Sequence, residues 1–401
     1  MDKPLRILAI VNLPWDPRLG AARVWIELAE QWTAAGHTVE KFCLTDAFPY
    51  PTKSRGLAGL RQLLFPYRAR QFVRQNAFRF DVIDALIGTF PFSKESVRFQ
   101  GLLVARSVGL YRLYHRFVQA SQAKWRDQPR GKLLGSFFYN FVDQQLRRNS
   151  DRAIRYCDLV NLPNEDEIEP LRSPPNFHRP TMVQPYGLNE ESRLVFAGAV
   201  EQPAERLQQK QICFVGAWSV RKGSRDWPEI IRRLLSASPD VHLMFLGTMA
   251  DEQTVLQDLQ LSNPGNVRSV STYEPAELPG LLRSCVLGLF PSYIEGFPFA
   301  LLEQLAAGIP VVAYDVGGPR HILRELGGKW LVNEGDTKAM AERALEVLGM
   351  NAAEYAALSD RCRFVAGQFH WESVASETLR QYSAALSHLR HGQPLAEIAV
   401  I

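Results

Sequence analysis

The feature that most constrains the fold is a repeated pattern of short apolar run, turn-prone loop, helical segment and glycine. The first run, Leu5–Val11, is followed by the loop sequence PWDPRLG and then by apolar residues at helical spacing over 24–35. Gly36 provides a helix stop, and 37–44 (HTVEKFCL) alternates like a second strand. Strand, loop, helix and strand open a parallel α/β unit, so we expect a Rossmann-like doubly wound sheet.

The same pattern restarts near residue 212, which predicts a second α/β domain. Further strands are expected at 81–87, 101–106, 158–162, 212–216, 241–247, 286–290 and 310–314, and helices at 227–235, 298–307 and 337–348. The stretch 190–211 shows no strong periodicity and many charges, and we place the domain junction there. We therefore expect one domain at 1–190 and a second domain at 191–371. The two sheets are expected to face each other across a cleft, with ligands at the carboxyl ends of the strands.

Composition fits a two-domain globular chain and excludes several classes. The chain has 401 residues, of which 46% are hydrophobic and 22% charged, and this is neither disordered nor fibrous composition. Lys and Arg exceed Asp and Glu by 9 in residues 1–190, whereas Asp and Glu exceed Lys and Arg by 5 in 191–401, giving the net charge of +4. The five cysteines form no CxxC pair, so we expect reduced thiols. With no apolar run of membrane-spanning length and no signal-peptide pattern, we expect a cytoplasmic protein.

Several common catalytic signatures are absent from the sequence. It contains no GxxxxGK[ST], no GxGxxG after the first strand, no HExxH and no GxSxG. The eight histidines are scattered, so no metal site is expected.

The most informative segment is Pro291–Val312, PSYIEGFPFALLEQLAAGIPVV. Glu295 follows an apolar strand, and Glu303 lies eight positions later in the next helix. The loop-to-helix junction Gly296–Phe299 lies between them, and helix N-terminal amides can bind phosphate. Two carboxylates beside an anion site suit the hydroxyls of a ribose and a sugar. The alternative from these residues alone is a pair of structural glutamates held in ion pairs.

This segment resembles the E-x7-E signature of the retaining glycosyltransferases of family 4, which have the GT-B fold. The spacing, the AAG turn, the following strand and the Gly317–Gly318 pair all match. The resemblance implies that Glu295 contacts the donor sugar and that Glu303 contacts the donor ribose. It also implies that Gly296, Phe297, Pro298 and Phe299 lie at the donor phosphates.

A second match is Phe214–Trp227, FVGAWSVRKGSRDW. Arg221 and Lys222 follow a strand there, where two cations would neutralise the charge that develops on a departing diphosphate. The alternative is a solvated basic loop. The family carries an Arg and a Lys-Gly element at this place, which implies diphosphate binding by Arg221 and Lys222. The sequence departs from the family at Ala217, where many members have an Arg.

The resemblance also implies that the domain at 1–190 binds the acceptor and that the domain at 191–371 binds the nucleotide-sugar donor. In the family a C-terminal helix, expected here near 372–390, packs back on the first domain.

Other parts of the resemblance are less specific. Gly20 corresponds to the family's glycine-rich turn against the diphosphate, although Ala21 replaces the second glycine. Thr248 and Tyr273 stand where the family holds the nucleobase, and Tyr273 is equally interpretable as a core aromatic.

The acceptor side matches the family poorly. Val108 stands where members often carry a His, and Arg106, Ser107 and His115 are weak candidates for acceptor contacts. Each of the three is also interpretable as a structural or surface residue.

Residues 47–80 contain seven cations and no acidic residue. Leu57, Leu60, Leu64 and Phe65 recur among them at near-helical spacing, which is typical of docking to an anionic membrane surface. The stretch also suits a phosphorylated acceptor, and the alternative is a solvated basic helix face. No aromatic-interleaved nucleic-acid module is visible, so no nucleic-acid partner is expected.

The sequence therefore predicts a retaining, metal-independent glycosyltransferase of the hexosyltransferase type. Its donor would be a nucleotide-diphosphate sugar, used as a co-substrate with no other cofactor. Its acceptor would be a glycan, a lipid-linked hydroxyl or a small molecule, in cell-envelope polysaccharide or glycolipid synthesis, in the cytoplasm or peripherally on the inner face of the membrane. The alternatives are a non-catalytic nucleotide-sugar-binding partner and another GT-B enzyme, such as a sugar-nucleotide epimerase.

Overall fold

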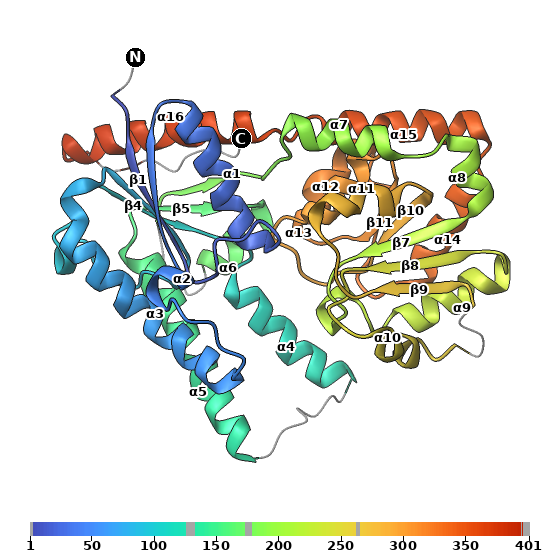
Figure 1. Ribbon diagram of the computed structural model, residues 1–401, viewed down its shortest axis with the longest axis horizontal. Helices are drawn as coiled ribbons and strands as arrows, with labels where there is room; N and C mark the ends of the chain where they lie inside the picture. The colour runs from blue at the N-terminus through green and yellow to red at the C-terminus, as the bar shows by residue number, and fades with distance from the viewer. Residues whose placement is uncertain (1–2, 126–132, 173–178, 262–264, 394, 396–401) are drawn as a thin grey trace. The chain divides into compact units, whose positions relative to one another are not determined.

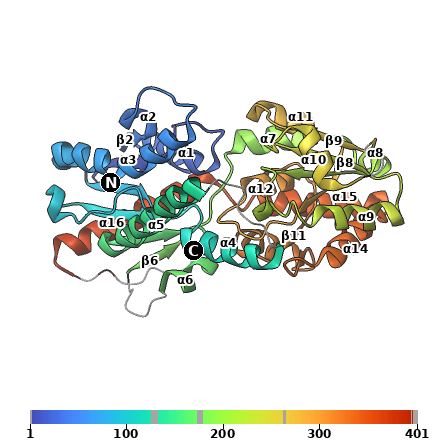
Figure 2. The same ribbon diagram turned by 90° about the horizontal axis from the view of Figure 1, so that it is seen from below.

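The computed structural model describes residues 3–125, 133–172, 179–261, 265–393 and 395. The chain divides into two compact units. The first comprises Met1–Tyr186 and Trp371–Ile401, and the second comprises Gly187–His370. Each unit is a parallel sheet with helices on both faces (Figures 1 and 2).

The sheet of the first unit has six parallel strands in the order β2-β1-β3-β4-β5-β6. These strands are β1 (Arg6–Val11), β2 (Thr38–Cys43), β3 (Val82–Leu86), β4 (Leu102–Arg106), β5 (Leu159–Leu162) and β6 (Thr181–Val183). The helices of this unit are α1 (Gly20–Ala34), α2 (Leu44–Ala47), α3 (Arg55–Asn76), α4 (Tyr111–Trp125), α5 (Leu133–Tyr156), α6 (Ile168–Arg172) and α16 (Trp371–Arg390). The strand order reverses between β1 and β3, as expected for a doubly wound sheet.

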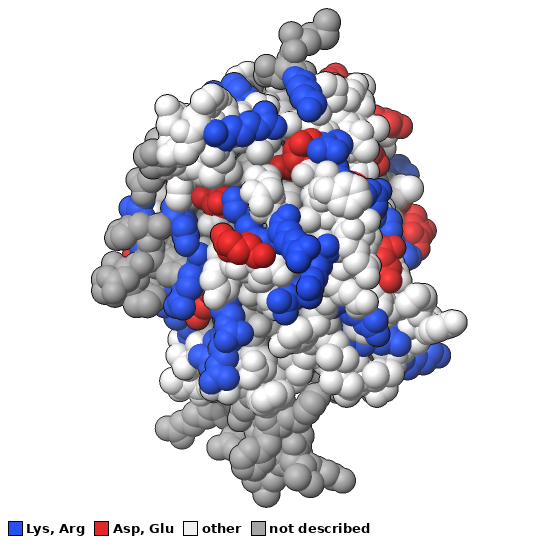
Figure 3. Space-filling view, turned by 90° about the vertical axis from the view of Figure 1, so that its left-hand side faces the viewer, with Lys and Arg blue, Asp and Glu red and all other residues white. Residues whose placement is uncertain are grey.

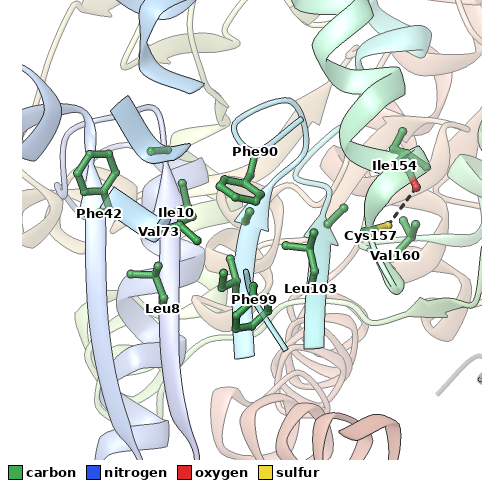
Figure 4. Packing of buried hydrophobic residues seen from close by; sticks show 14 of the residues in the cluster. Leu8, Ile10, Phe42, Val73, Phe90, Phe99, Leu103, Ile154, Cys157 and Val160 are labelled. Carbon is green, nitrogen blue, oxygen red and sulfur yellow. Dashed lines mark hydrogen bonds between the residues drawn. The ribbon is translucent and has the colours of Figure 1, made fainter. Parts of the chain in front are cut away.

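One face of this sheet packs against α3 and α5. Leu8, Ile10 and Leu103 of the strands belong to one buried hydrophobic cluster with Val73 of α3 and Ile154 of α5 (Figure 4). Alternate strand residues face this core because side chains alternate across a strand.

The opposite face packs against α1 and α16 and contains a buried ion pair. Asp84 of β3 and Arg106 of β4 are both fully buried, and Arg106 Nη2 lies 2.8 Å from Asp84 Oδ2. The hydroxyl of Tyr382 on α16 donates to Asp84 Oδ2 at 2.6 Å, and Trp25 Nε1 of α1 donates to Asp84 Oδ1 at 3.2 Å. Trp32 of α1 also donates to the carbonyl of Ala375 at 3.2 Å. These polar contacts join the C-terminal helix to strands that lie nearly 300 residues earlier in the chain.

The second unit has a sheet of the order β12-β11-β10-β7-β8-β9, again all parallel. Its strands are β7 (Gln211–Val215), β8 (His242–Leu246), β9 (Val267–Val270), β10 (Cys285–Phe290), β11 (Val311–Tyr314) and β12 (Leu331–Val332). Its helices are α7 (Glu190–Ala199), α8 (Pro203–Gln209), α9 (Trp227–Ala237), α10 (Glu252–Leu259), α11 (Leu278–Leu282), α12 (Phe299–Ala306), α13 (Gly317–Leu323), α14 (Thr337–Leu348) and α15 (Ala352–Ala366). The chain order reverses between β7 and β10, so the carboxyl ends of these two neighbours flank the topological switch point.

The segment 190–211 differs from its interpretation as an aperiodic junction. It forms the helices α7 and α8, which pack on α12 and α15 of the second unit. Arg206 of α8 is fully buried, and it donates to the carbonyl of Gly308 at 3.3 Å and to Ser359 Oγ at 3.0 Å. These helices are short, and their stability comes from such packing, which periodicity does not reveal.

The expected long strands are confirmed within one or two residues at each end, and β6, β9 and β12 are additional. The expectation of reduced thiols agrees with the structure, where all five cysteines are free and buried. Among the described residues, no helix is both long enough and apolar enough to span a bilayer.

The buried ion pair gives a first prediction. Asp84→Asn leaves the Arg106 guanidinium buried without its counter-charge, so it should lower the free energy of unfolding by about 3–5 kcal/mol in urea denaturation. Tyr382→Phe removes two hydrogen bonds, one donated to Asp84 and one accepted from Arg106, and should cost about 2 kcal/mol. It is the measurement to use where Asp84→Asn does not fold.

The matched control is Glu377→Gln on α16, which breaks an exposed ion pair with Arg380. It should change the unfolding free energy by less than about 1 kcal/mol. Equal, small effects from Asp84→Asn and Glu377→Gln would contradict a structural role for the buried pair.

Candidate functional site

The candidate site of the second unit begins in the loop that follows β7. The loop contains the short turn Val220–Lys222 and ends at Gly223, whose φ is +82°. A Cβ atom at Gly223 would lie 2.3 Å from the carbonyl oxygen of Pro291, which follows β10. Glycine at this position therefore allows the loop after β7 to lie directly against the segment after β10.

This close approach brings Arg221 and Lys222 to the same carboxylate. Arg221 Nη1 donates to the carbonyl of Ile294 at 3.0 Å and lies 3.4 Å from Glu295 Oε1. Lys222 Nζ forms an ion pair with the same Oε1 atom and lies 4.8 Å from the centroid of the Phe290 ring. The side chains of Arg221, Lys222 and Glu295 are 29%, 12% and 8% exposed. Burial lowers the pKa of Lys222, although the charge of Glu295 opposes this shift. Two cations share one carboxylate, so this group has an excess positive charge when both cations are protonated.

The junction between β10 and α12 is held by a close contact with α13. The amide of Gly318 donates to the carbonyl of Glu295 at 3.3 Å. A Cβ atom at Gly318 would lie 2.6 Å from Pro298 Cδ and 2.8 Å from the carbonyl oxygen of Gly296. Gly318 is thus required by the close approach of two backbones. The N-cap position of α12 is Pro298, which provides no side-chain cap.

The other residues expected in this segment have different surroundings. Phe297 is buried and packs against Phe299 and Phe369, with ring centroids 5.8 Å apart in each pair. Glu303 is buried in the second turn of α12, closer to the helix start than the expected two turns because α12 begins at Phe299.

Thr248 lies in the turn that follows β8, and Tyr273 follows the neighbouring strand β9. Thr248 is buried, its carbonyl accepts from the amide of Trp218 at 2.7 Å, and its hydroxyl donates to the carbonyl of Ala250 at 3.0 Å. Tyr273 is half-buried with its ring against Gly247, whose φ is +69° and where a Cβ atom would lie 3.0 Å from Tyr273 Cε1. The turn after β8 is therefore joined to the loop after β7 through Trp218.

A buried polar group that the sequence did not indicate also positions these loops. Asp226 Oδ2 accepts a hydrogen bond from Tyr293 at 2.7 Å and from Tyr314 at 2.8 Å. Asp226 follows β7, Tyr293 follows β10 and Tyr314 ends β11. One carboxylate therefore joins the segments after β7 and β10 to the end of β11, at the carboxyl edge of the sheet. Burial and the adjacent Asp226 raise the pKa of both tyrosines. The sequence provided only a weak indication of this role for Asp226. Two tyrosines lie at strand ends, and a buried tyrosine hydroxyl needs a hydrogen-bond partner.

Four of the expected site residues belong to the first unit. Gly20 was expected at the diphosphate, and Arg106, Ser107 and His115 were weak candidates for acceptor contacts. Gly20 is the exposed first residue of α1. Arg106 is in the core. Burial by itself lowers the pKa of the guanidinium, but the charge of the adjacent Asp84 raises that pKa, and the net shift is upward. This geometry gives Arg106 a structural role. His115 is on α4, with Nε2 3.1 Å from Gln119 Nε2 and 3.3 Å from Arg147 Nη1.

Ser107 belongs to a buried network that includes an acid not indicated by the sequence. Ser107 Oγ donates to Glu167 Oε2 at 2.5 Å, and the amide of Leu110 donates to Glu167 Oε1 at 3.1 Å. The hydroxyl of Tyr186 donates to the carbonyl of Ser107 at 2.5 Å. Burial raises the pKa of Glu167 to about 7, although the bonds from Ser107 and Leu110 favour the ionised form. Glu167 lies at the carboxyl edge of the first sheet, beside the loop that precedes α4.

The basic stretch 47–80 is mostly the helix α3. Phe65 is buried, whereas Leu57, Leu60 and Leu64 are 42–43% exposed on a different side of the helix. Three of the seven cations have partners among the described residues, since Arg79 is paired with Glu40, Arg70 lies over the ring of Phe92 and Arg61 lies over the ring of Phe48. Lys53, Arg68 and Arg74 are exposed and Arg61 is half-buried; the side chain of Arg55 lies outside the described side chains. Figure 3 shows a face on which Lys and Arg side chains predominate over Asp and Glu.

A segment that lies wholly within the second unit matches a known protein family. Residues 198–363 match the family model of the glycosyl transferases group 1. The chain is 31% identical over 279 residues to the D-inositol 3-phosphate glycosyltransferase of Mycolicibacterium smegmatis, in an alignment that covers 67% of this chain and 60% of that protein. The chain thus spans less than two thirds of this relative's length.

Solved structures show the same architecture. Sucrose-phosphate synthase from Thermosynechococcus elongatus superposes with a TM-score of 0.73 at 18% identity, covering 95% of this chain and 99% of that one. HepE of Anabaena, solved in complex with UDP-glucose, gives a TM-score of 0.64 at 16% identity, covering 95% and 100%. At these identities the likeness shows the fold, which is GT-B. Among the residues that the structure describes, no group of three His, Cys, Asp or Glu side chains is arranged to hold a metal ion.

Glu167 gives a prediction for the pH dependence of stability. Its pKa in the folded protein, about 7, lies above its ordinary value of 4.5. Folding therefore favours the protonated form of Glu167. The contribution of this group to the free energy of unfolding is fully present below pH 4.5 and is lost as the pH rises to about 7. At 1.36 kcal/mol per pKa unit, the loss is at most about 3 kcal/mol.

Glu167→Gln keeps an acceptor for the Leu110 amide but cannot ionise. Urea denaturation between pH 4.5 and 8 should show wild-type stability falling relative to this variant, with the difference constant above pH 8. Parallel pH profiles for the two proteins would show that Glu167 is not the titrating group.

Proposed function

We propose that this protein is a retaining, metal-independent glycosyltransferase that moves a sugar from a nucleotide-diphosphate sugar to a hydroxyl acceptor. The observation that carries the proposal is the sharing of Glu295 by Arg221 and Lys222 at the switch point of the second sheet. These residues lie in the segment that matches the glycosyl transferases group 1 model. The cell-envelope role, a glycan, lipid-linked or small-molecule acceptor, and a peripheral membrane location are part of the same proposal.

The charge of the group suits a nucleoside diphosphate. Glu295 accepts contacts from both cations. A diphosphate beside Arg221 and Lys222 would take over as their counter-ion, and this would leave the Glu295 carboxylate to accept hydrogen bonds from sugar hydroxyls. Glu303, buried on α12, would accept from the ribose. The N-terminus of α12 and its preceding residues Gly296–Pro298 would lie at the phosphates, where the helix dipole favours negative charge.

The proposed transfer step needs charge stabilisation and one proton transfer. The acceptor oxygen forms a bond to the anomeric carbon, and the bond between that carbon and the diphosphate oxygen breaks. The hydroxyl proton of the acceptor passes to the departing diphosphate oxygen on the same face of the sugar, which retains the anomeric configuration. Arg221 and Lys222 would stabilise the negative charge on the leaving group, which is the role of a preorganised cationic site.

The identity of the donor is open to a direct test. The free energy of unfolding should rise with one of UDP-, GDP- or ADP-sugars in the presence of EDTA, by about 2.7 kcal/mol at 100 times the Kd. UDP-sugars are the first to measure, because HepE, which shares the fold, was solved in complex with UDP-glucose. Glu303→Ala should remove the stabilisation, whereas the control Glu342→Ala, an exposed glutamate on α14, should retain it.

The catalytic part is tested by turnover with the stabilising donor and a panel of hydroxyl acceptors. Arg221→Ala and Lys222→Met should lower kcat by about 10²–10³-fold, more than they weaken donor binding. The exposed Lys338→Ala on α14 is the control. Inverted product configuration, or a requirement for a divalent metal, would refute the respective part of the proposal.

Two alternative functions give different results in the same measurements. A non-catalytic partner would bind the donor without turnover across the whole acceptor panel. A sugar-nucleotide epimerase would convert the donor with no acceptor present.

Helix α3 is the proposed contact with an anionic membrane surface. Its exposed leucines, Leu57, Leu60 and Leu64, recur at i, i+3 and i+7 beside the exposed cations Arg68 and Arg74. Such a helix places apolar side chains at the acyl boundary and cations at the headgroups.

Vesicle co-sedimentation tests this contact. Replacing all three leucines with Ser should weaken binding to vesicles of phosphatidylcholine with phosphatidylglycerol by about tenfold or more. The control is Phe364→Ser, which removes an exposed aromatic side chain from the second unit. Equal binding of the triple variant and wild type would exclude α3 as the membrane contact.

A further inference from the structure

A cavity of about 390 Å³ lies between α4 and α5 in the first unit. Tyr111, Arg112, His115 and Arg116 line it from α4, and Gln144, Arg147, Arg148, Ser150 and Asp151 line it from α5. On each helix these positions recur at intervals of three and four residues, so they form the facing sides of the two helices. A volume of this size is sufficient for a small organic ligand.

The cavity lies at the edge of the sheet where ligands of doubly wound folds bind. Helix α4 begins soon after the carboxyl end of β4. Ser150 lies against Gly88, which follows β3, since a Cβ atom at Gly88 would be 3.6 Å from Ser150 Oγ. The two helices therefore extend the carboxyl edge of the first sheet, the usual position for a bound ligand.

The lining is cationic, and carboxylates hold two of its arginines in place. Arg112 is paired with Asp151 at 2.7 Å and donates to the carbonyl of Pro170 at 3.0 Å. Arg147 lies 3.4 Å from Asp143, which also accepts from the hydroxyl of Tyr111. These contacts fix the guanidinium planes before any ligand arrives, which reduces the entropy cost of binding.

The arginines of the lining have unused donor capacity. Arg148 is exposed and has no ion-pair partner among the described residues. Arg147 Nε is buried and faces Asp143 Oδ2 at 3.4 Å, but it makes no hydrogen bond within the described part of the chain. Arg116 is paired with the exposed Glu169, at 3.4 Å. His115 adds a ring that lies 3.9 Å from Asp143.

We infer that this cavity is a binding site for the phosphoryl group of a small phosphorylated molecule, with Arg147 and Arg148 as its main ligands. Guanidinium groups match the geometry of phosphate oxygens through paired hydrogen bonds, and the remaining volume accommodates a polyol or sugar-sized body. The binding site stands on this geometry alone. Its use for the acceptor substrate rests additionally on the proposed glycosyl transfer.

Isothermal titration with glucose 6-phosphate and inorganic phosphate tests the site, with glucose as the uncharged control. Wild type should bind both phosphates and not glucose, and affinity should fall with rising salt. Arg148→Ala and Arg147→Ala should each weaken phosphate binding at least about tenfold, as expected for loss of a charged hydrogen-bond donor. Arg152→Ala removes an exposed arginine of α5 that does not line the cavity, and it should bind as wild type does.

A second arm distinguishes a soluble phosphate ester from a lipid headgroup. Vesicles of phosphatidylcholine with phosphatidic acid present the same phosphomonoester on a surface. If Arg148→Ala loses binding to these vesicles and inorganic phosphate competes for it in wild type, the ligand is a headgroup. If Arg148→Ala affects only glucose 6-phosphate, the ligand is soluble. Either result supports the site.

The inference is overturned if wild type binds neither phosphate nor vesicle phosphomonoester, or if Arg147→Ala and Arg148→Ala bind them as wild type does. Stabilisation by a nucleotide-sugar, measured on the same variants, separates this failure from failure of the proposed function. The stabilisation by a nucleotide-sugar should be the same in Arg148→Ala and Arg152→Ala as in wild type, because neither substitution lies in the second unit.

Discussion

The parallel pairing of β7 with both β8 and β10 is the constraint on which the candidate site depends. In a parallel sheet all carboxyl ends emerge at one edge, and the chain order reverses between β7 and β10. The loops that follow these two strands leave the switch point in different directions, so space opens between them. Gly223 then lets the two segments touch, and Glu295 is brought to Arg221 and Lys222. The ion-pair group is thus a consequence of strand order together with one left-handed glycine.

Much of the fold was predictable because its central strands are continuous apolar runs. The strands β1, β4, β7 and β10 are buried on both faces, and such runs between turn signals indicate a parallel sheet. The short β6 and β12 were not predicted, because two or three residues show no period. The helices α7 and α8 were missed for a related reason, since they depend on a few buried side chains such as Phe196 and Arg206.

The candidate site was predictable in its residue types and less so in its surroundings. The sequence indicated Arg221, Lys222 and Glu295 as charged residues after strands, but their mutual contact depends on a strand order that sequence spacing does not reveal. Asp226 was not indicated, because its two partners lie 67 and 88 residues away. For Arg106 the sequence left two interpretations open, a weak acceptor contact and a structural residue. The structure pairs it with Asp84, a lone acid within the neighbouring apolar strand, and that acid was the available signal of a buried partner.

The second unit begins and ends at neighbouring points of the chain. The amide of Leu188 donates to the carbonyl of Phe369 at 3.0 Å, and Leu188 forms a parallel bridge with His370. In the first unit Tyr186 stacks on Trp371, with ring centroids 5.8 Å apart. The second unit is therefore an insertion into the first, and both joints are closed by contacts within a single unit. A folded insertion whose ends adjoin adds little loop-closure entropy to its host. Each unit can accordingly change its loops, and with them its ligands, without altering the path of the chain through the other.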